Sequence, residues 1–304
     1  MAQKEVKGRI ASVKNIQKIT RAMEMVAAAR LRKAEQRVQQ LRDYAGAVRR
    51  MTRQAAEAAG NIPNVPLLAE HEAEQHVGIV LFTGDRGLAG AFNSQIVRAG
   101  VRAAAEYEGD GKGVVFFAAG RRGVSSLRFR QREPEGAFEG FTDRPSYADA
   151  RDIASALMAA FVDGKVDRVE VFYNRFQSAM SQVVTRETLL PLKHASIMEA
   201  EDGAEDGEDR HEGDGDGKHA LVEYEPDPDA ILERLVPAYV EISIFRSMLE
   251  STASEHGARM SAMRNASENA SDIIDDLTLQ MNRERQAEIT QEIMEVVAGA
   301  ESLV

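Results

Sequence analysis

The feature that most restricts the fold of this chain is a long N-terminal segment that reads as one unbroken helix. Between residues 4 and 59 there is no proline, and glycine occurs only at Gly8 and Gly46. Apolar residues recur at alternating steps of three and four, which places them along one side of a helix. They are Val6, Ile10, Val13, Ile16, Ile19, Met23, Val26, Leu31, Ala34, Val38, Leu41, Ala45 and Val48. At about 1.5 Å per residue the helix is roughly 80 Å long, too long to fold back within an ordinary globular domain.

The C-terminal segment has the same character. Prolines and aspartates at 226–229 provide a helix start, and Pro237 inside the pattern predicts a kink. The apolar and small residues at helical spacing are Ile231, Leu235, Tyr239 and Ile242, then Met260, Met263, Ser267, Ala270, Ile274, Leu277 and Met281, and finally Ile289, Ile293 and Val296. The small members of this stripe permit close approach of a second helix.

The two terminal segments carry opposite charge. Residues 1–60 hold 14 lysines and arginines against 5 acidic residues, and residues 230–304 hold 13 acidic residues against 6 basic ones. Two long helices of opposite charge with narrow apolar stripes pair most simply as an antiparallel coiled coil. A helical bundle inside a globule is the alternative that the spacing leaves open.

The middle of the chain alternates between strand and helix patterns. Buried strands are predicted at 76–83, 113–119, 169–173 and 180–185, and helices at 88–107, 121–129 and 147–161. This order predicts a Rossmann-like α/β domain. We therefore expect an N-terminal shaft helix at 1–60, an α/β domain at 61–198, an acidic flexible insertion at 199–228 and a C-terminal shaft helix at 229–304.

The glycine-rich turn at residues 84–90, GDRGLAG, lies between a predicted strand and a predicted helix. Such a turn can hold a phosphate on its backbone N–H groups. The spacing, however, matches neither the dinucleotide fingerprint nor the P-loop, and no lysine follows. A tight crossover turn in which Asp85 and Arg86 pair or cap is the favoured reading, and no cofactor is predicted.

The acidic tract at 199–219 contains ten acidic residues among five glycines. Residues 212–223 fit the spacing of a calcium-binding loop, with Glu212 at its first position, but no helix can enter it from the glycine-broken side. A solvated loop is the favoured prediction, serving solubility or acting as a charge-dependent brake on a partner.

Several functional classes are excluded or disfavoured. The chain has no cysteine, which removes disulfides, thiolate zinc sites and cysteine nucleophiles. Its six histidines show no metal-ligand spacing, and no acid–base set is visible, so no catalytic residue is predicted. No apolar run approaches a membrane span and no secretory signal is visible, which favours a cytosolic chain. A nucleotide-dependent α/β enzyme and a free coiled-coil scaffold or nucleic-acid binder remain the alternatives.

Four long segments of the sequence resemble, in order, the signatures of one known family. They are IASVKNIQKITRAMEMVAA at 10–28, DRGLAGAFN at 85–93, ASEHGARMSAMRNA at 253–266 and LTLQMNRERQAEITQEI at 277–293. The chain is thereby similar to the gamma subunits of F-type, proton-translocating ATP synthases. The acidic tract at 199–219 is the one stretch that the resemblance does not cover.

The resemblance implies a central rotor stalk without catalytic activity of its own. Such a stalk couples proton flow through the membrane sector to ATP synthesis at the catalytic subunits by rotation, and it regulates ATPase activity. In that family the paired terminal helices turn inside a hexamer of catalytic beta and non-catalytic alpha subunits, and the α/β domain sits against the epsilon subunit and the membrane c-ring. This implies a peripheral protein at the cytoplasmic face of the cell membrane, with no direct membrane insertion and no nucleic-acid partner. It also implies partner-contact positions, which are Met23, Arg259, Gln286, Thr290 and Glu295.

Overall fold

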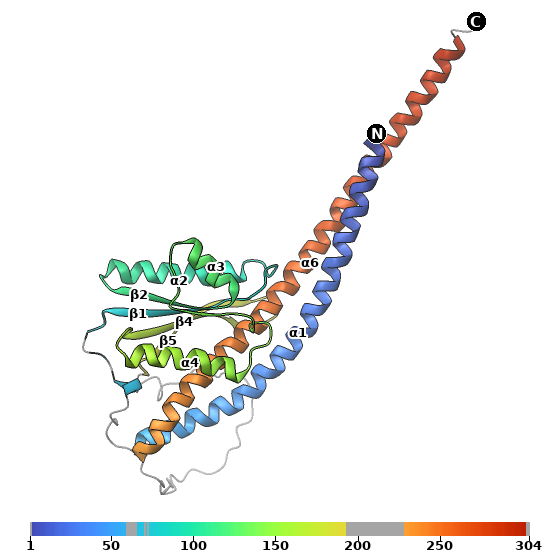
Figure 1. Cartoon of the computed structure of the whole chain (residues 1–304). Helices are drawn as coiled ribbons and strands as arrows, with labels where there is room; N and C mark the ends of the chain where they lie inside the picture. Colours follow the sequence, from blue (N-terminus) through green and yellow to red (C-terminus); the bar gives the residue numbers. More distant parts are fainter. Residues whose placement is uncertain (1, 59–65, 70, 72, 193–227, 302–304) are drawn as a thin grey trace.

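The computed structural model describes residues 2–58, 66–69, 71, 73–192 and 228–301. Two long helices, α1 (Ala2–Ala58) and α6 (Pro228–Glu301), run side by side and pass along one edge of an α/β domain (Figure 1). We call the two helices the shaft and residues 66–192 the sheet domain. The predicted insertion at 199–228, with its calcium-type loop, lies almost wholly outside the described residues.

The two shaft helices are antiparallel, because the N-terminal end of α1 and the C-terminal end of α6 lie at the same end of the molecule (Figure 1). The antiparallel helix pair and the central α/β domain predicted from the sequence are thus confirmed. Helix α6 continues through Pro237, where we had predicted a kink, and its last turns extend past the N-terminus of α1. We call residues 285–298 of α6, all of which are exposed, the overhang.

The seam between the helices departs from the predicted stripe in the middle of α1. Ile16, Ile19 and Val26 are 54%, 59% and 53% exposed, so our assignment of them to the buried stripe was wrong. Among the described side chains of α1, the buried ones are Val6, Ile10, Thr20, Ala27, Leu31, Ala34, Val38 and Val48. Small and hydroxyl side chains therefore face α6 in this region, and an apolar face of α1 is left on the outside.

The sheet domain is built on five strands in the order β3-β2-β1-β4-β5. The first four are parallel, and β5 runs antiparallel to β4. The strands are β1 (His76–Phe82), β2 (Gly113–Ala119), β3 (Gly136–Phe138), β4 (Arg168–Phe176) and β5 (Gln182–Leu190). Strand β3 was not predicted, because it has three residues and follows a proline-containing loop.

Helices cover both faces of the sheet (Figure 1). They are α2 (Phe92–Gly109) and α3 (Arg121–Phe129) on one face, and α4 (Tyr147–Val162) with the first half of α6 on the other. Successive side chains of β1 alternate between the two cores, with Ile79 and Leu81 beneath α2 and Val80 and Phe82 beneath α4 and α6. Helix α6 is therefore both a shaft helix and part of the sheet domain's core.

Candidate functional site: a groove between the shaft and the sheet domain

A groove of about 550 Å³ lies where α1 passes the carboxyl ends of the strands. Its walls come from α1, from the loop after β1, from the start of α3 and from α6. The lining residues are Ile19, Ala22, Met23, Val26, Ala27, Arg30, Arg86, Gly87, Leu88, Arg122, His256 and Arg259. Among ordinary ligand pockets its size is typical, and its lining combines an apolar side with a basic one.

The apolar side is the outward face of α1. Ile19 and Val26 point away from α6 because Thr20 and Ala27 occupy the seam, and Met23 is half-buried between these faces. Leu88, in the loop after β1, is 64% exposed and has a positive φ of 62°. An exposed apolar surface on a helix that already has a partner helix is typical of an interaction site.

The basic side consists of four arginines from four different segments. Among the described side chains, Arg86 and Arg122 make no ion pair, and Arg30 pairs with Asp143. Arg259 is 8% exposed, pairs with Glu255 one helical turn earlier and donates to the backbone carbonyl of Gly87 at 3.3 Å. The groove therefore offers two free guanidinium groups and two that are held by the protein itself.

Glu255 and His256 are buried behind the groove. Burial raises the pKa of the Glu255 carboxyl, although the guanidinium of Arg259 acts in the opposite direction. Burial and the nearby Arg259 lower the pKa of His256 to about 4, although Asp143, 3.8 Å away, opposes this shift. At neutral pH His256 is therefore uncharged, and the positive charge of the groove comes from its arginines.

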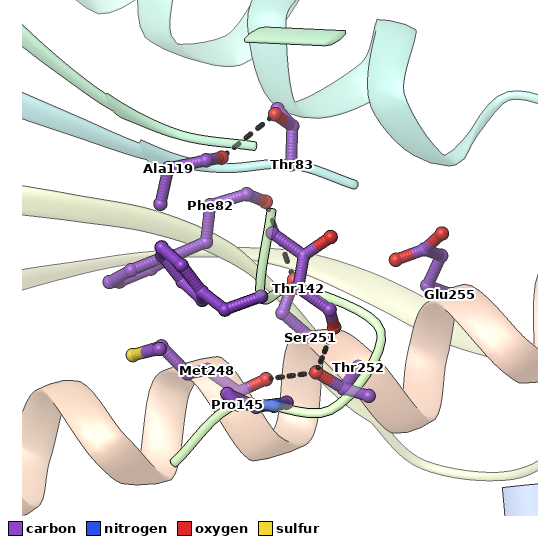
Figure 2. A pocket seen from close by; sticks show the side chains of 10 residues that line it. Phe82, Thr83, Ala119, Thr142, Pro145, Met248, Ser251, Thr252 and Glu255 are labelled. Carbon is purple, nitrogen blue, oxygen red and sulfur yellow. Dashed lines mark hydrogen bonds between the residues drawn. The ribbon is translucent and has the colours of Figure 1, made fainter. Parts of the chain in front are cut away.

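The crevice where a doubly wound sheet would bind a nucleotide is filled by α6. The strand order reverses direction between β1 and β4, and ligands of such folds bind outside the carboxyl ends at that point. Here Ser251 donates to the carbonyl of Phe82 at 3.3 Å (Figure 2). Ser254 donates to the carbonyl of Asn174 at 2.8 Å. The space left is about 10 Å³, roughly enough for one water molecule.

The glycine turn after β1 serves the fold itself. The carboxylate of Asp85 accepts hydrogen bonds from the backbone N–H groups of Arg121, Gly140 and Thr142. Burial would raise the pKa of Asp85, but these hydrogen bonds hold it below its usual value. The Asp85 carboxylate thus caps the first N–H group of α3 and holds the loop before α4, in line with the capping role predicted for Asp85.

The predicted partner-contact residues fall into two groups. Met23 and Arg259 lie together in the groove, on different helices. Gln286, Thr290 and Glu295 are exposed on the overhang, where Thr290 donates to the carbonyl of Gln286 at 2.8 Å. The structure therefore brings the first two together and leaves the other three on a separate surface.

Sequence reasoning missed half of the groove's basic side. Arg86, His256 and Arg259 lie in recognised motifs, whereas Arg30 and Arg122 lie outside all four of them. Within the described ranges, no cluster of three metal-ligating side chains is present and no helix has the length and apolarity of a membrane span.

Known proteins resemble the chain over its whole length. The sequence model of the ATP synthase family that matches it, described as "ATP synthase", spans residues 2–303. The ATP synthase gamma chain of Rubrobacter xylanophilus is 42% identical, over 99% of this chain and 98% of the relative, and that of Acidiphilium cryptum is 43% identical, over 99% of each.

Solved structures give the same result. A chain of the central stalk and c-ring of the Tetrahymena thermophila mitochondrial ATP synthase matches with a TM-score of 0.60 and 26% identity, over 82% of this chain and 99% of that one. A chain of the Euglena gracilis mitochondrial enzyme shares the fold with a TM-score of 0.66 at 18% identity, over 99% of this chain and 94% of that one. The chain belongs to the ATP synthase gamma-chain family, and it is a non-catalytic central-stalk subunit of the rotary F-type enzyme.

Proposed function

We propose that the groove is the surface through which this stalk contacts a catalytic beta subunit. Its apolar side, with Ile19 and Met23, lies next to the free guanidinium groups of Arg86 and Arg122. A loop that carries both carboxylates and apolar side chains would be complementary to such a surface. The observation that carries the proposal is the apolar face of α1. This face does not pack against α6, and it is exposed in the part of α1 that lies beside these arginines.

The overhang is proposed as a second contact surface, inside the alpha–beta hexamer. Helix α6 extends past the N-terminus of α1 here, so no described residue of α1 covers its apolar side chains; Ile293 is 57% and Val296 is 73% exposed. A sleeve of surrounding subunits would cover this surface, and Gln286, Thr290 and Glu295 would supply its polar contacts. A largely apolar surface with few polar contacts suits a part of the stalk that must slide during rotation.

The remaining partners are proposed from the family. Residues 1–60 and 229–304 would form the shaft, residues 61–198 would face the epsilon subunit and the c-ring, and residues 199–228 would form an insertion of this chain. This places the subunit at the cytoplasmic face of the cell membrane, bound through the complex, with no nucleic-acid partner.

Coupling then follows from an asymmetric surface. A stalk changes the state of a catalytic subunit only if its orientation binds the open and closed states with different free energies. The groove lies on one side of the shaft, so each rotation presents it to the three catalytic subunits in turn. Proton flow that turns the stalk would thereby drive ATP synthesis at sites on the partners.

The experiment uses the absence of cysteine from this chain. Leu88→Cys gives a single thiol at the groove, and Phe129→Cys gives a matched control on the sheet domain, where Phe129 is 85% exposed. A maleimide photo-cross-linker on each variant is activated in the complex purified from native membranes. We expect Leu88→Cys to capture the beta subunit and Phe129→Cys to do so only at background level. Equal capture, or capture of epsilon alone from Leu88→Cys, would contradict the groove assignment.

A further inference from the structure

One loop of the sheet domain is bound to both shaft helices. It comprises residues 139–146, between β3 and α4, and we call it the clamp loop. From α1, Arg30 forms an ion pair with Asp143, and Arg37 donates a hydrogen bond to the backbone carbonyl of Pro145. These two arginines lie seven residues apart on α1, two turns of the helix, so they grip the loop at two points along the same face.

The same loop is bound to α6. The hydroxyl of Thr252 donates to the carbonyl of Thr142 at 2.9 Å and also lies 2.8 Å from the carbonyl of Met248 in its own helix (Figure 2). His256, one turn further along α6, faces the carboxylate of Asp143. Thr252 is buried, so its hydrogen bond to the carbonyl of Thr142 is shielded from water and is stronger than an exposed one.

The clamp loop is in turn held rigidly by the sheet domain. Asp85 accepts hydrogen bonds from its backbone N–H groups at Gly140 and Thr142, at 3.0 and 3.1 Å. At its other end, Ser146 and Asp149 form a capping box at the start of α4. The loop is therefore tied to the carboxyl end of β1, to α4 and to both shaft helices.

We propose that the clamp loop transmits rotation of the sheet domain to α1, with Asp143 and Arg37 as positioning residues. Helix α6 is packed directly into the sheet domain's core, through Val240, Ile244 and Met248, and so turns with it. Helix α1 lies outside that core and carries the outward face of the groove. The clamp loop gives α1 its own polar link to the sheet domain, so that both helices carry torque and the groove keeps its orientation relative to the rotor.

The test measures the torsional stiffness of the rotor in single complexes under viscous load, together with protons pumped per ATP hydrolysed. Asp143→Asn removes the charge that pairs with Arg30, and Arg37→Gln removes the guanidinium that reaches the carbonyl of Pro145. We expect each single variant to lose part of the stiffness and the double variant to lose about half of it, because α1 then has neither of these polar links to the clamp loop and is driven through α6. The number of protons pumped per ATP should fall as the load rises.

The controls separate this role from a general loss of structure. Arg128→Gln removes an exposed arginine that pairs with Glu133 within the sheet domain, and it should keep the wild-type stiffness. Arg37→Lys keeps a donor for the carbonyl of Pro145 and should recover most of the stiffness. Wild-type stiffness in both Asp143→Asn and Arg37→Gln would overturn the proposal.

A covalent bridge covers the case in which either single variant fails to assemble. In Arg37→Cys/Arg144→Cys the hydrogen bond to Pro145 is lost, and a short bifunctional thiol reagent then replaces it with a covalent link between α1 and the exposed position 144 of the clamp loop, whose charge acts on Arg37 in the native chain. We expect low stiffness before the reagent is added and at least wild-type stiffness afterwards. Stiffness that does not change on bridging would show that this link carries no torque.

Discussion

The hydroxyl oxygens of Thr20 and Ser267 lie 2.6 Å apart and join the two shaft helices across 247 positions of the sequence. Thr20 also lies 3.0 Å from the carbonyl of Gln17, and the side-chain amide of Gln17 donates to the carbonyl of Ser267 at 3.4 Å. This polar cluster replaces apolar packing in the middle of the seam. It is the local reason why Ile16 and Ile19 lie on the outside of the shaft.

The hydroxyl pair gives a prediction about shaft stability. Thr20→Val keeps the shape of the side chain but leaves the hydroxyl of Ser267 without its partner, which should cost about 1–2 kcal/mol of local stability. The double variant Thr20→Val/Ser267→Ala should cost less than the sum of the single variants, because both partners are removed together. Hydrogen exchange of residues 13–27 in the full chain measures the local opening. Additive effects would show that the two hydroxyls do not interact.

The groove gives a prediction about coupling. Met23→Lys places a long cation beside the proposed contact with the catalytic subunit, where a new charged contact would have to break in every turn. We expect the complex to assemble while the number of protons pumped per ATP hydrolysed falls. Met25→Lys is the matched control, because Met25 is 64% exposed and does not line the groove. Equal coupling in both variants, measured in membrane vesicles, would remove Met23 from the contact.

The buried histidine gives a prediction about pH. The pKa of His256 is lowered to about 4 by burial and by Arg259, with Asp143 acting in the opposite direction, and Arg30 also lowers it. The unfolded chain, with an ordinary histidine pKa near 6.5, therefore binds a proton that the folded chain does not. The contribution of His256 to the free energy of unfolding is therefore fully present above about pH 6.5. It decreases by roughly 3 kcal/mol as the pH falls toward 4.

Replacing the histidine tests that assignment. His256→Gln should flatten the decrease of the unfolding midpoint between pH 6.5 and pH 4, measured by thermal unfolding of the full chain. A decrease as steep as that of the wild type would mean that other groups cause it.

A glycine at the start of α3 gives a prediction about the sheet domain. Gly120 has a φ of +97°, and a Cβ there would lie 2.1 Å from the carbonyl oxygen of Thr83. Gly111 has a φ of +79° but open space around it. We expect Gly111→Ala to cost about 1 kcal/mol from backbone conformation alone, and Gly120→Ala to cost about 3 kcal/mol or more, because β1 must also move. Equal shifts in thermal midpoint would contradict the close approach.

The sequence by itself determined the helices of the shaft and the type of the central domain. Long segments without proline, with apolar residues at steps of three and four, can bury those residues only as helices, and this held for the stripe of α6 that includes Met263 and Ala270. Short runs of apolar residues, such as the one that forms β2, likewise identified the strands between the helices. These are local signals, because the period of the side chains depends only on the backbone of the same segment.

Only the tertiary structure decided which face of α1 is buried. Ile19 and Val26 are more apolar than Thr20 and Ala27, yet the smaller residues form the seam. Small side chains let the axes of two helices come close, and the hydroxyl of Ser267 on α6 supplies the partner that Thr20 needs. That choice depends on the register of a helix far away in the sequence. The groove depends on it as well, because Arg122, Arg259 and Met23 come from three separate segments and meet only once the shaft is docked on the sheet domain.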